Sequence, residues 1–415
     1  MKSQRHTLVR TLKGIRMPKT TRREAMLAAL AAPVVARTTL AASSQAALMV
    51  PYSDDLLPSG VRSRFVGGIN GLRIHVLEAG FEERGRPGVL LLHGFPELAY
   101  SWRKIMVPLA EAGYHVFAPD QRGYGRTTGW DANYDGDTSE YRALNLVRDA
   151  LGLVHAFGHR SVAVVGHDYG SGVAAWCAIV RPDVFISVAL MSSPFSGTFP
   201  IPFGTREGVV PETPVYTGPG SAAMDEALAK LLRPRKHYQR YYTTREANPN
   251  MWRAPQGVHA FLRAYYHHKS ADWEGNRPYR LTSTTAAEIS KMPTYYIMEL
   301  EDGMAETVAK HMPSVERVAA NRWLPDKDLE VYAREYERTG FQGGLNWYRS
   351  FSSGLAELEL FSGRTIDQPS IFIAGESDWG SYQSRGALET MQNSACTNMR
   401  GIHMVQGAGH WVQQE

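Results

Sequence analysis

A strand that turns sharply into a helix is the feature that most constrains how this chain folds. The apolar stretch 162–165 predicts the strand, and a helix is predicted over 172–179. Gly166 and Gly170 bound the turn, and a turn this tight needs small neighbours because it projects its central side chain at the carboxyl edge of the sheet. The central residue is Asp168. Aspartate is also a common helix N-cap, so the motif alone leaves a catalytic and a capping role open.

Strands and helices alternate through the first half of the chain. Asn70 and Gly71 lie between two apolar stretches and predict a type I′ hairpin turn. Short apolar runs separated by helical stretches predict parallel strands whose faces are covered by helices. The predicted strands are 61–66, 72–78, 89–92, 115–119, 162–165 and 185–191, and the predicted helices are 101–112, 141–157 and 172–179.

This alternation stops between about residue 193 and residue 363. Loops rich in proline and glycine occupy 200–219, and aromatic-rich helical stretches follow at 228–242 and 257–266. The alternation then returns, with predicted strands at 370–374 and 402–405 and a helix near 385–391. We therefore expect an α/β core formed by 60–193 and 364–415, with a helical lid at 194–363 inserted into it.

Two further polar residues follow the returning strands. Asp378 comes after the first of these strands and His410 after the second. The chain order nucleophile, acid, histidine is that of α/β-hydrolases. Asp378 can instead close a turn, and His410 can be an ordinary loop histidine. Three such residues, each after a predicted core strand and in this order, favour a catalytic triad of Asp168, Asp378 and His410.

The loop 93–97, which follows the first buried strand, is expected to complete the site. Such a loop supplies one backbone amide to an oxyanion hole, and the residue after the nucleophile supplies the other. The predicted donors are the amides of Phe95 and Tyr169. A simple turn bounded by Gly94 and Pro96 is the alternative.

Several of these motifs resemble the soluble epoxide hydrolase family, the branch of the α/β-hydrolase fold that has an aspartate nucleophile. The resemblance covers most of residues 60–415 and thins between 243 and 325. It implies a mostly parallel sheet flanked by helices, with an enlarged helical lid. The matching segments are 93–97 with 101–103, 118–125, 166–170 and, in the lid, 237–242 and 340–349.

The two lid segments imply a pair of catalytic tyrosines. Segment 340–349 resembles the family's segment with one lid tyrosine, which gives that role to Tyr348. Segment 237–242 resembles the other and favours Tyr238, with Tyr241 and Tyr242 as alternatives.

The resemblance implies hydrolysis of a small apolar epoxide to a vicinal diol. Asp168 would attack a ring carbon while the lid tyrosines bind the ring oxygen. His410, oriented by Asp378, would then activate the water that hydrolyses the ester. No metal or other cofactor is expected, because the reaction needs none and no zinc-ligand spacing is present.

The sequence departs from the family pattern in three places. Tyr169 stands where many relatives have tryptophan, the lid stretch 252–276 has no recognised counterpart, and the sequence to Glu415 ends before a helix that normally packs behind the histidine loop. We therefore expect either that the sequence is truncated or that His410 is weakly supported.

Three other functions compete with epoxide hydrolysis. A haloalkane dehalogenase shares the aspartate nucleophile, but it usually grips the halide with the tryptophan that Tyr169 replaces. A non-catalytic ligand binder shares the fold but has no need for all three triad residues. A serine esterase is excluded because position 168 is not serine.

The N-terminal residues carry a net excess of positive charge. Residues 1–46 hold nine lysines and arginines and one acid, which leaves 36 basic and 40 acidic residues in the rest. The body is therefore not expected to bind nucleic acid. Arg22 and Arg23, followed by the apolar run 25–36, resemble a twin-arginine export signal that is removed on export to the periplasm or medium. That run is too short to anchor the chain in a membrane. An organellar transit peptide is the alternative.

Overall fold

The computed structural model describes residues 49–199 and 220–415. The predicted export signal (1–46) and the predicted loops at 200–219 lie outside these residues. The chain divides into two units, Met1–Met49 and Val50–Glu415, and the elements described here belong to Val50–Glu415. In the two described ranges, no helix combines the length and the apolar character that crossing a bilayer would require.

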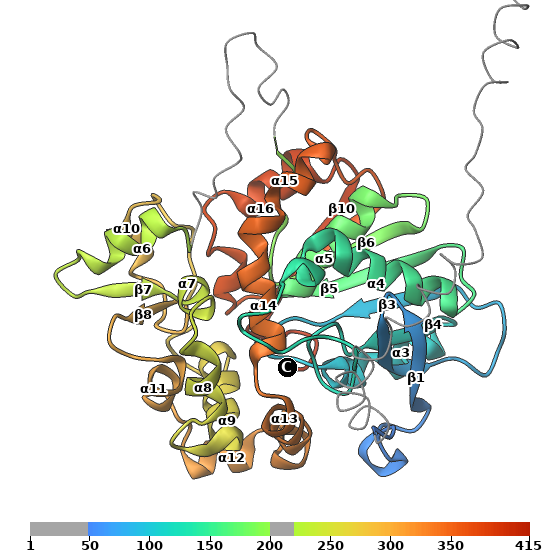
Figure 1. The fold of residues 1–415 in the computed structure, drawn as a ribbon, viewed down its shortest axis with the longest axis horizontal. Coiled ribbons are helices and arrows are strands. Elements are labelled where there is room, and N and C mark those ends of the chain that lie inside the picture. Colours follow the sequence, from blue (N-terminus) through green and yellow to red (C-terminus); the bar gives the residue numbers. More distant parts are fainter. Residues whose placement is uncertain (1–48, 200–219) are drawn as a thin grey trace, which may run out of the picture. The chain divides into compact units, whose positions relative to one another are not determined.

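The centre of this unit is one sheet, which has eight strands in the described residues (Figure 1). The strand order is β1-β2-β4-β3-β5-β6-β9-β10, and every pair from β4 to β10 is parallel. Strand β2 is antiparallel to both its neighbours. The predicted fold class is confirmed. The strands are β1 (Val61–Ile69), β2 (Leu72–Ala79), β3 (Gly88–Leu92), β4 (His115–Pro119), β5 (Val162–His167), β6 (Phe185–Met191), β9 (Ser370–Gly375) and β10 (Met399–Val405).

The hairpin between β1 and β2 forms where the sequence predicts it. Asn70 has a φ of 49° and Gly71 a φ of 83°. Type I′ turns require positive φ at both central residues, and asparagine followed by glycine is the pair that tolerates it best. The side-chain amide of Asn70 also donates to Asp149 at 2.7 Å, which ties the turn to the helix that follows β4.

The core helices agree with prediction except at their ends. They are α3 (Arg103–Glu111), α4 (Ala143–Ala156), α5 (Tyr169–Val180) and α16 (Ala387–Thr390), which continues as a turn of π-helix at Met391–Ala395. Helix α5 begins at Tyr169, three residues earlier than expected, because the chain enters the helix directly from the turn at Asp168.

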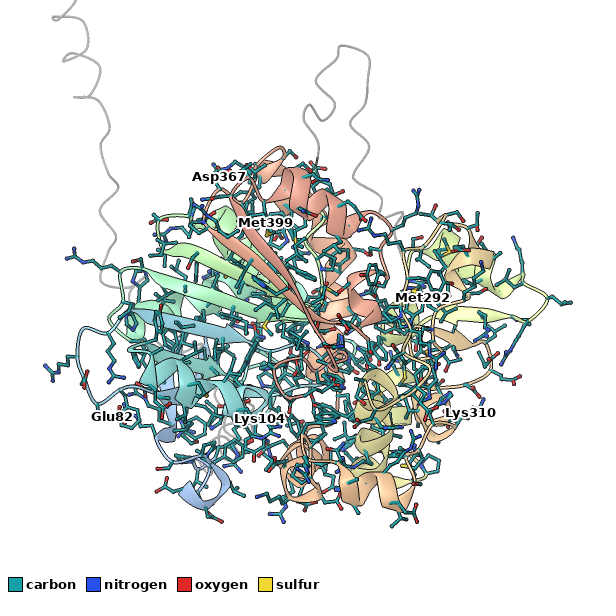
Figure 2. The ribbon with its side chains drawn as sticks, turned by 180° about the vertical axis from the view of Figure 1, so that it is seen from behind. Glu82, Lys104, Met292, Lys310, Asp367 and Met399 are labelled. Carbon is teal, nitrogen blue, oxygen red and sulfur yellow. The ribbon has the colours of Figure 1, made fainter. Side chains whose placement is uncertain are left out.

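A helical insertion lies between β6 and β9. Figure 1 shows most of it beside the sheet, and in the reverse view of Figure 2 Met292 and Lys310 mark it on the side opposite Glu82, which follows β2. The predicted helix at 257–266 is confirmed. The helices are α6 (Ala222–Ala229), α7 (Tyr238–Tyr242), α8 (Ala247–Trp252), α9 (Gly257–Lys269), α10 (Ala286–Ile289), α11 (Met304–Ala309), α12 (Val315–Ala320), α13 (Asp326–Thr339), α14 (Gln342–Phe351) and α15 (Leu355–Leu358).

The predicted single helix at 228–242 is wrong. Strand β7 (Arg235–His237) separates α6 from α7 and pairs with β8 (Ile297–Glu299). Pro234 explains the break, because the residue before a proline is disfavoured in the α conformation and the helix ends ahead of it.

Candidate active site

Asp168 lies on a strained turn between β5 and α5. Its φ is 53° and its ψ is −119°, a region that non-glycine residues rarely adopt. The glycines on either side make the turn possible, since a Cβ on Gly166 would lie 2.0 Å from the carbonyl oxygen of Gly170. Asp168 occupies the N-cap position of α5, but its carboxylate accepts no capping hydrogen bond from that helix. The capping role left open by the sequence is therefore wrong.

The Asp168 carboxylate faces the two partners that the sequence predicted. The backbone amide of Phe95 donates to Oδ1 at 3.1 Å, and Nε2 of His410 lies 3.2 Å from Oδ2. Burial acts to raise the pKa of Asp168, but the contact with His410 and the positive charge of Lys269 outweigh it and hold the pKa well below its usual value. The carboxylate is therefore ionised, as a nucleophile requires.

His410 is oriented by Asp378. Its Nδ1 atom lies 3.0 Å from Oδ1 of Asp378, and the amide of Gly380 donates to the same oxygen at 2.7 Å. Asp378 is buried, and the pKa of its carboxyl is lowered because the charge and hydrogen bond of His410 exceed the effect of burial. The three predicted triad residues therefore meet at the carboxyl edge of the parallel strands.

The histidine loop is held more firmly than the sequence suggested. The amide of His410 donates to the carbonyl of Lys269 at 3.1 Å. Its own carbonyl accepts from Nε2 of His167 at 2.7 Å and from the hydroxyl of Ser192 at 3.0 Å. These contacts come from β5, from the end of β6 and from α9, so the lid and the core both fix the loop.

A buried ion pair that the sequence did not reveal lies behind the triad. Oε2 of Glu97 accepts from Nδ1 of His167 at 2.6 Å and from the amide of Gly94 at 2.9 Å. Because both ring nitrogens of His167 face acceptors, the ring is an imidazolium. Burial acts to lower the pKa of His167, but the negative charge and the hydrogen bond of Glu97 outweigh burial. The pKa of His167 is therefore raised above its usual value. In the sequence, His167 precedes Asp168 and Glu97 lies two residues after Phe95. This proximity to predicted site residues was the only sequence feature that pointed to them.

The second predicted amide donor, Tyr169, is the first residue of α5 and adjoins Asp168. Its hydroxyl donates to the carbonyl of Trp347 at 2.9 Å, and its ring packs edge-on against the rings of Trp347 and Tyr348. The Tyr169 side chain therefore forms a wall of the site, and its hydroxyl hydrogen-bonds the lid backbone at Trp347.

Tyr348 and Asp168 line the same pocket, which has a volume of about 210 Å³. The Tyr348 ring lies 5.7 Å from that of Phe95 and 5.1 Å from that of Tyr242. Burial keeps the pKa of Tyr348 well above its usual value, so the phenol is protonated and able to donate. The other lining residues are Tyr169, Gly172, Ser193, Gly220, Gln239, Arg240, Thr243, Phe351 and Ser352.

The structure distinguishes the three tyrosines of segment 237–242. The ring of Tyr238 lies 6.2 Å from that of Tyr348, and its hydroxyl accepts from the Gln239 amide at 3.2 Å. Tyr242 is fully buried and its hydroxyl lies 3.2 Å from that of Tyr265. Tyr241 lies below the ammonium of Lys236 and lines a different pocket. Tyr238 and Tyr242 therefore both lie beside Tyr348, Tyr238 is retained as the second donor that the sequence favours, and Tyr241 is not brought to the site.

Comparison with known proteins agrees with this geometry. The family model described as alpha/beta hydrolase fold matches residues 87–415. The chain is 32% identical to Epoxide hydrolase B of Mycobacterium tuberculosis, over 83% of this chain and 92% of that protein. An epoxide hydrolase from an endophytic Streptomyces has a TM-score of 0.66 at 30% identity, covering 86% of this chain and 92% of its own. Potato (Solanum tuberosum) epoxide hydrolase I has a TM-score of 0.63 at 28% identity, covering 85% of this chain and 94% of its own. The chain therefore belongs to the epoxide hydrolase family of the α/β-hydrolase fold.

Proposed function

We propose that this protein hydrolyses an epoxide to a vicinal diol through a covalent ester on Asp168. One observation carries the proposal: an ionised carboxylate faces a histidine base at 3.2 Å and shares a pocket with a protonated phenol. The relatives named above, which are themselves called epoxide hydrolases, support the same reaction. The aromatic rings of Tyr169, Tyr348 and Phe351 in the pocket wall suit an apolar substrate of moderate size.

The first step is attack of the Asp168 carboxylate on a ring carbon. Oδ1 is held by the Phe95 amide, so Oδ2 is the attacking oxygen. A carbon–oxygen bond forms as the ring carbon–oxygen bond breaks, and the ring oxygen takes its proton from Tyr348 or Tyr238. No proton has to be removed from the nucleophile, which is why a carboxylate serves here and a serine is not needed.

The second step is hydrolysis of the ester. Nε2 of His410 removes a proton from water as the water oxygen attacks the ester carbon, and Asp378 stabilises the imidazolium. Negative charge then forms on Oδ1, where the Phe95 amide already donates. The intermediate collapses as its bond to Oδ2 breaks, and the diol leaves with Oδ2 and the proton from His410. The remaining proton of the attacking water passes to the tyrosinate left by the first step, which restores the carboxylate of Asp168 and the phenol.

Single-turnover hydrolysis in ¹⁸O-labelled water tests this route. The first-turnover diol should be unlabelled at its new oxygen, because that oxygen comes from Asp168, and the label should appear in the protein. Diol formation from aromatic and aliphatic epoxides should disappear in Asp168→Ala. A fully labelled first-turnover diol, or normal activity of Asp168→Ala, would overturn the proposal.

Haloalkane cleavage is less well supported. That reaction needs donors that hold the departing halide, and the hydroxyl of Tyr169 is already used by the Trp347 carbonyl. We expect no chloride release from short chloroalkanes under conditions that give diol from epoxides.

We also propose that residues 1–46 direct export of the protein. The support is the pair Arg22 and Arg23 ahead of the apolar run 25–36. Exported material should begin after residue 46 on N-terminal sequencing, and replacement of both arginines by lysine should retain the protein in the cytoplasm. Exported material that begins at Met1 would contradict this.

A further inference from the structure

Lys269 places an ammonium group in the protein interior. It is the last residue of α9, and only 3% of its surface is exposed. Four aromatic rings surround Nζ, with centroids at 5.2 to 5.9 Å: those of Tyr265, Tyr295, Tyr296 and Trp411. Within the described residues, no carboxylate forms an ion pair with it. Cation–π contacts offset only part of the cost of burying such a charge, so a functional reason is called for.

The aromatic cage shares residues with the active site. The ring of Trp411 lies 4.7 Å from that of His410, and the ring of Tyr296 lies 5.2 Å from that of Tyr238. The Lys269 carbonyl also accepts from the His410 amide. Lys269 is not among the residues that line the 210 Å³ pocket. The ammonium therefore lies behind the base and the lid tyrosine, outside the pocket itself.

That charge acts on the buried acids of the site. Burial lowers the pKa of Lys269 below its usual value, although the negative charges of Asp168, Asp378 and Glu97 oppose the lowering. In return, Lys269 helps to hold the pKa of Asp168 down. Water screens this electrostatic interaction less than it would at the surface, because both groups are buried.

We propose that Lys269 is a positioning residue for the second chemical step, in which its fixed positive charge stabilises the oxyanion on the Asp168 carboxyl group. The inference rests on the proposed function. Alkylation removes the negative charge of Asp168, and water attack on the ester returns it to the same group. A cation fixed behind His410, whose field reaches that group, does not assist the first step and does assist the second.

The test is to separate the two steps in the full-length chain. Lys269→Met removes the charge at similar length, Lys269→Gln is a second neutral variant, and Lys269→Arg keeps the charge. Lys236→Met is the matched control, because Nζ of Lys236 also lies over a tyrosine ring, 4.8 Å from Tyr241, but away from the triad. After mixing with excess epoxide, acid-quenched samples are analysed by intact-protein mass spectrometry for the ester, and diol is measured in parallel.

Both neutral variants should hydrolyse the ester about 10-fold more slowly and form it at an undiminished rate, because the lost positive charge stabilises only the second step. The ester should accumulate, and kcat and KM should fall together. Lys269→Arg should recover most of the lost rate, and Lys236→Met should behave like the wild type. Folding of each variant is checked by its thermal midpoint.

Two outcomes overturn the inference. If the neutral variants form and hydrolyse the ester at wild-type rates, or slow both steps equally, Lys269 has only a structural role. In both cases the wild type still forms ester and diol, so the proposed function stands. If the wild type forms neither, the proposed function fails and this inference fails with it.

Discussion

Nε2 of His410 lies 3.2 Å from Oδ2 of Asp168, and the same ring contacts Asp378 through Nδ1 at 3.0 Å. The imidazole thus bridges the nucleophile and the residue that orients it. All three side chains are nearly removed from solvent. A base in this position reaches a water that attacks an ester on Asp168, and it has no proton to remove in the first step.

His410→Gln should therefore separate the two steps. Ester formation needs no base and should continue, whereas turnover should fall about 10³-fold or more, as for other catalytic bases. Intact-protein mass spectrometry should show an adduct with the mass of the substrate. The double variant with Asp168→Ala should show none. Absence of the adduct in His410→Gln would contradict the assignment of the base.

Tyr348→Phe and Tyr238→Phe should each slow ester formation, because each removes a donor to the ring oxygen. General acids contribute about 10² to 10⁴-fold, so we expect kcat/KM to fall at least about 10²-fold for Tyr348→Phe. Tyr241→Phe is the control, since Tyr241 lines another pocket. Pre-steady-state kinetics of ester formation measures the effect. A loss in Tyr241→Phe equal to that in Tyr238→Phe would contradict the choice between them.

Glu97→Gln should destabilise the fold strongly. Glu97 and His167 are both fully buried, and Glu97 also accepts from Gln413 at 2.7 Å. Removing one partner leaves a buried imidazolium unpaired, which costs about 3–5 kcal/mol. Urea unfolding measures the free energy. Glu83→Gln, which breaks the exposed pair with Arg86, should cost less than about 1 kcal/mol. Similar values for the two variants would contradict this account of the buried pair.

His237 should make stability fall in acid. Burial lowers the pKa of His237 to about 3, whereas an unfolded histidine titrates near 6.5. The unfolded state therefore binds a proton first, and stability decreases as pH falls from about 6.5 towards 3, by up to about 1.4 kcal/mol per pH unit. The unfolding free energy of His237→Phe should depend less steeply on pH. The difference in slope from the wild type should correspond to about one proton. Parallel slopes in the two proteins would contradict the burial of a neutral ring.

Local patterns predicted much of the core. The strands β4 and β6 begin and end at the predicted residues. The hairpin at Asn70 and Gly71 also forms as expected. Such features depend on a few neighbouring residues, whose backbone preferences and apolar spacing are visible in the sequence. Strand β7 was missed because its pairing partner, β8, lies about sixty residues away and is equally short.

In the candidate site, too, the sequence predicted what depends on local pattern and missed what depends on contacts between distant segments. The order of Asp168, Asp378 and His410 after three core strands identified the triad, because parallel strands end at one edge of the sheet. The sequence left Tyr238, Tyr241 and Tyr242 as alternatives. The rings of Tyr238 and Tyr242 pack against Tyr348, whereas Tyr241 lines another pocket. These neighbours come from α7 and α14, which are far apart along the chain.

The sequence by itself determined which groups are available: a carboxylate on a glycine-bounded turn, an acid and a histidine after later strands, and tyrosines in an insertion. Only the tertiary structure decided the charge state of these groups and which of them act together. The pairing of Glu97 with His167 and the burial of Lys269 behind His410 have no local signal. The physical reason is that a pKa depends on burial and on nearby charges, and folding brings both from distant segments.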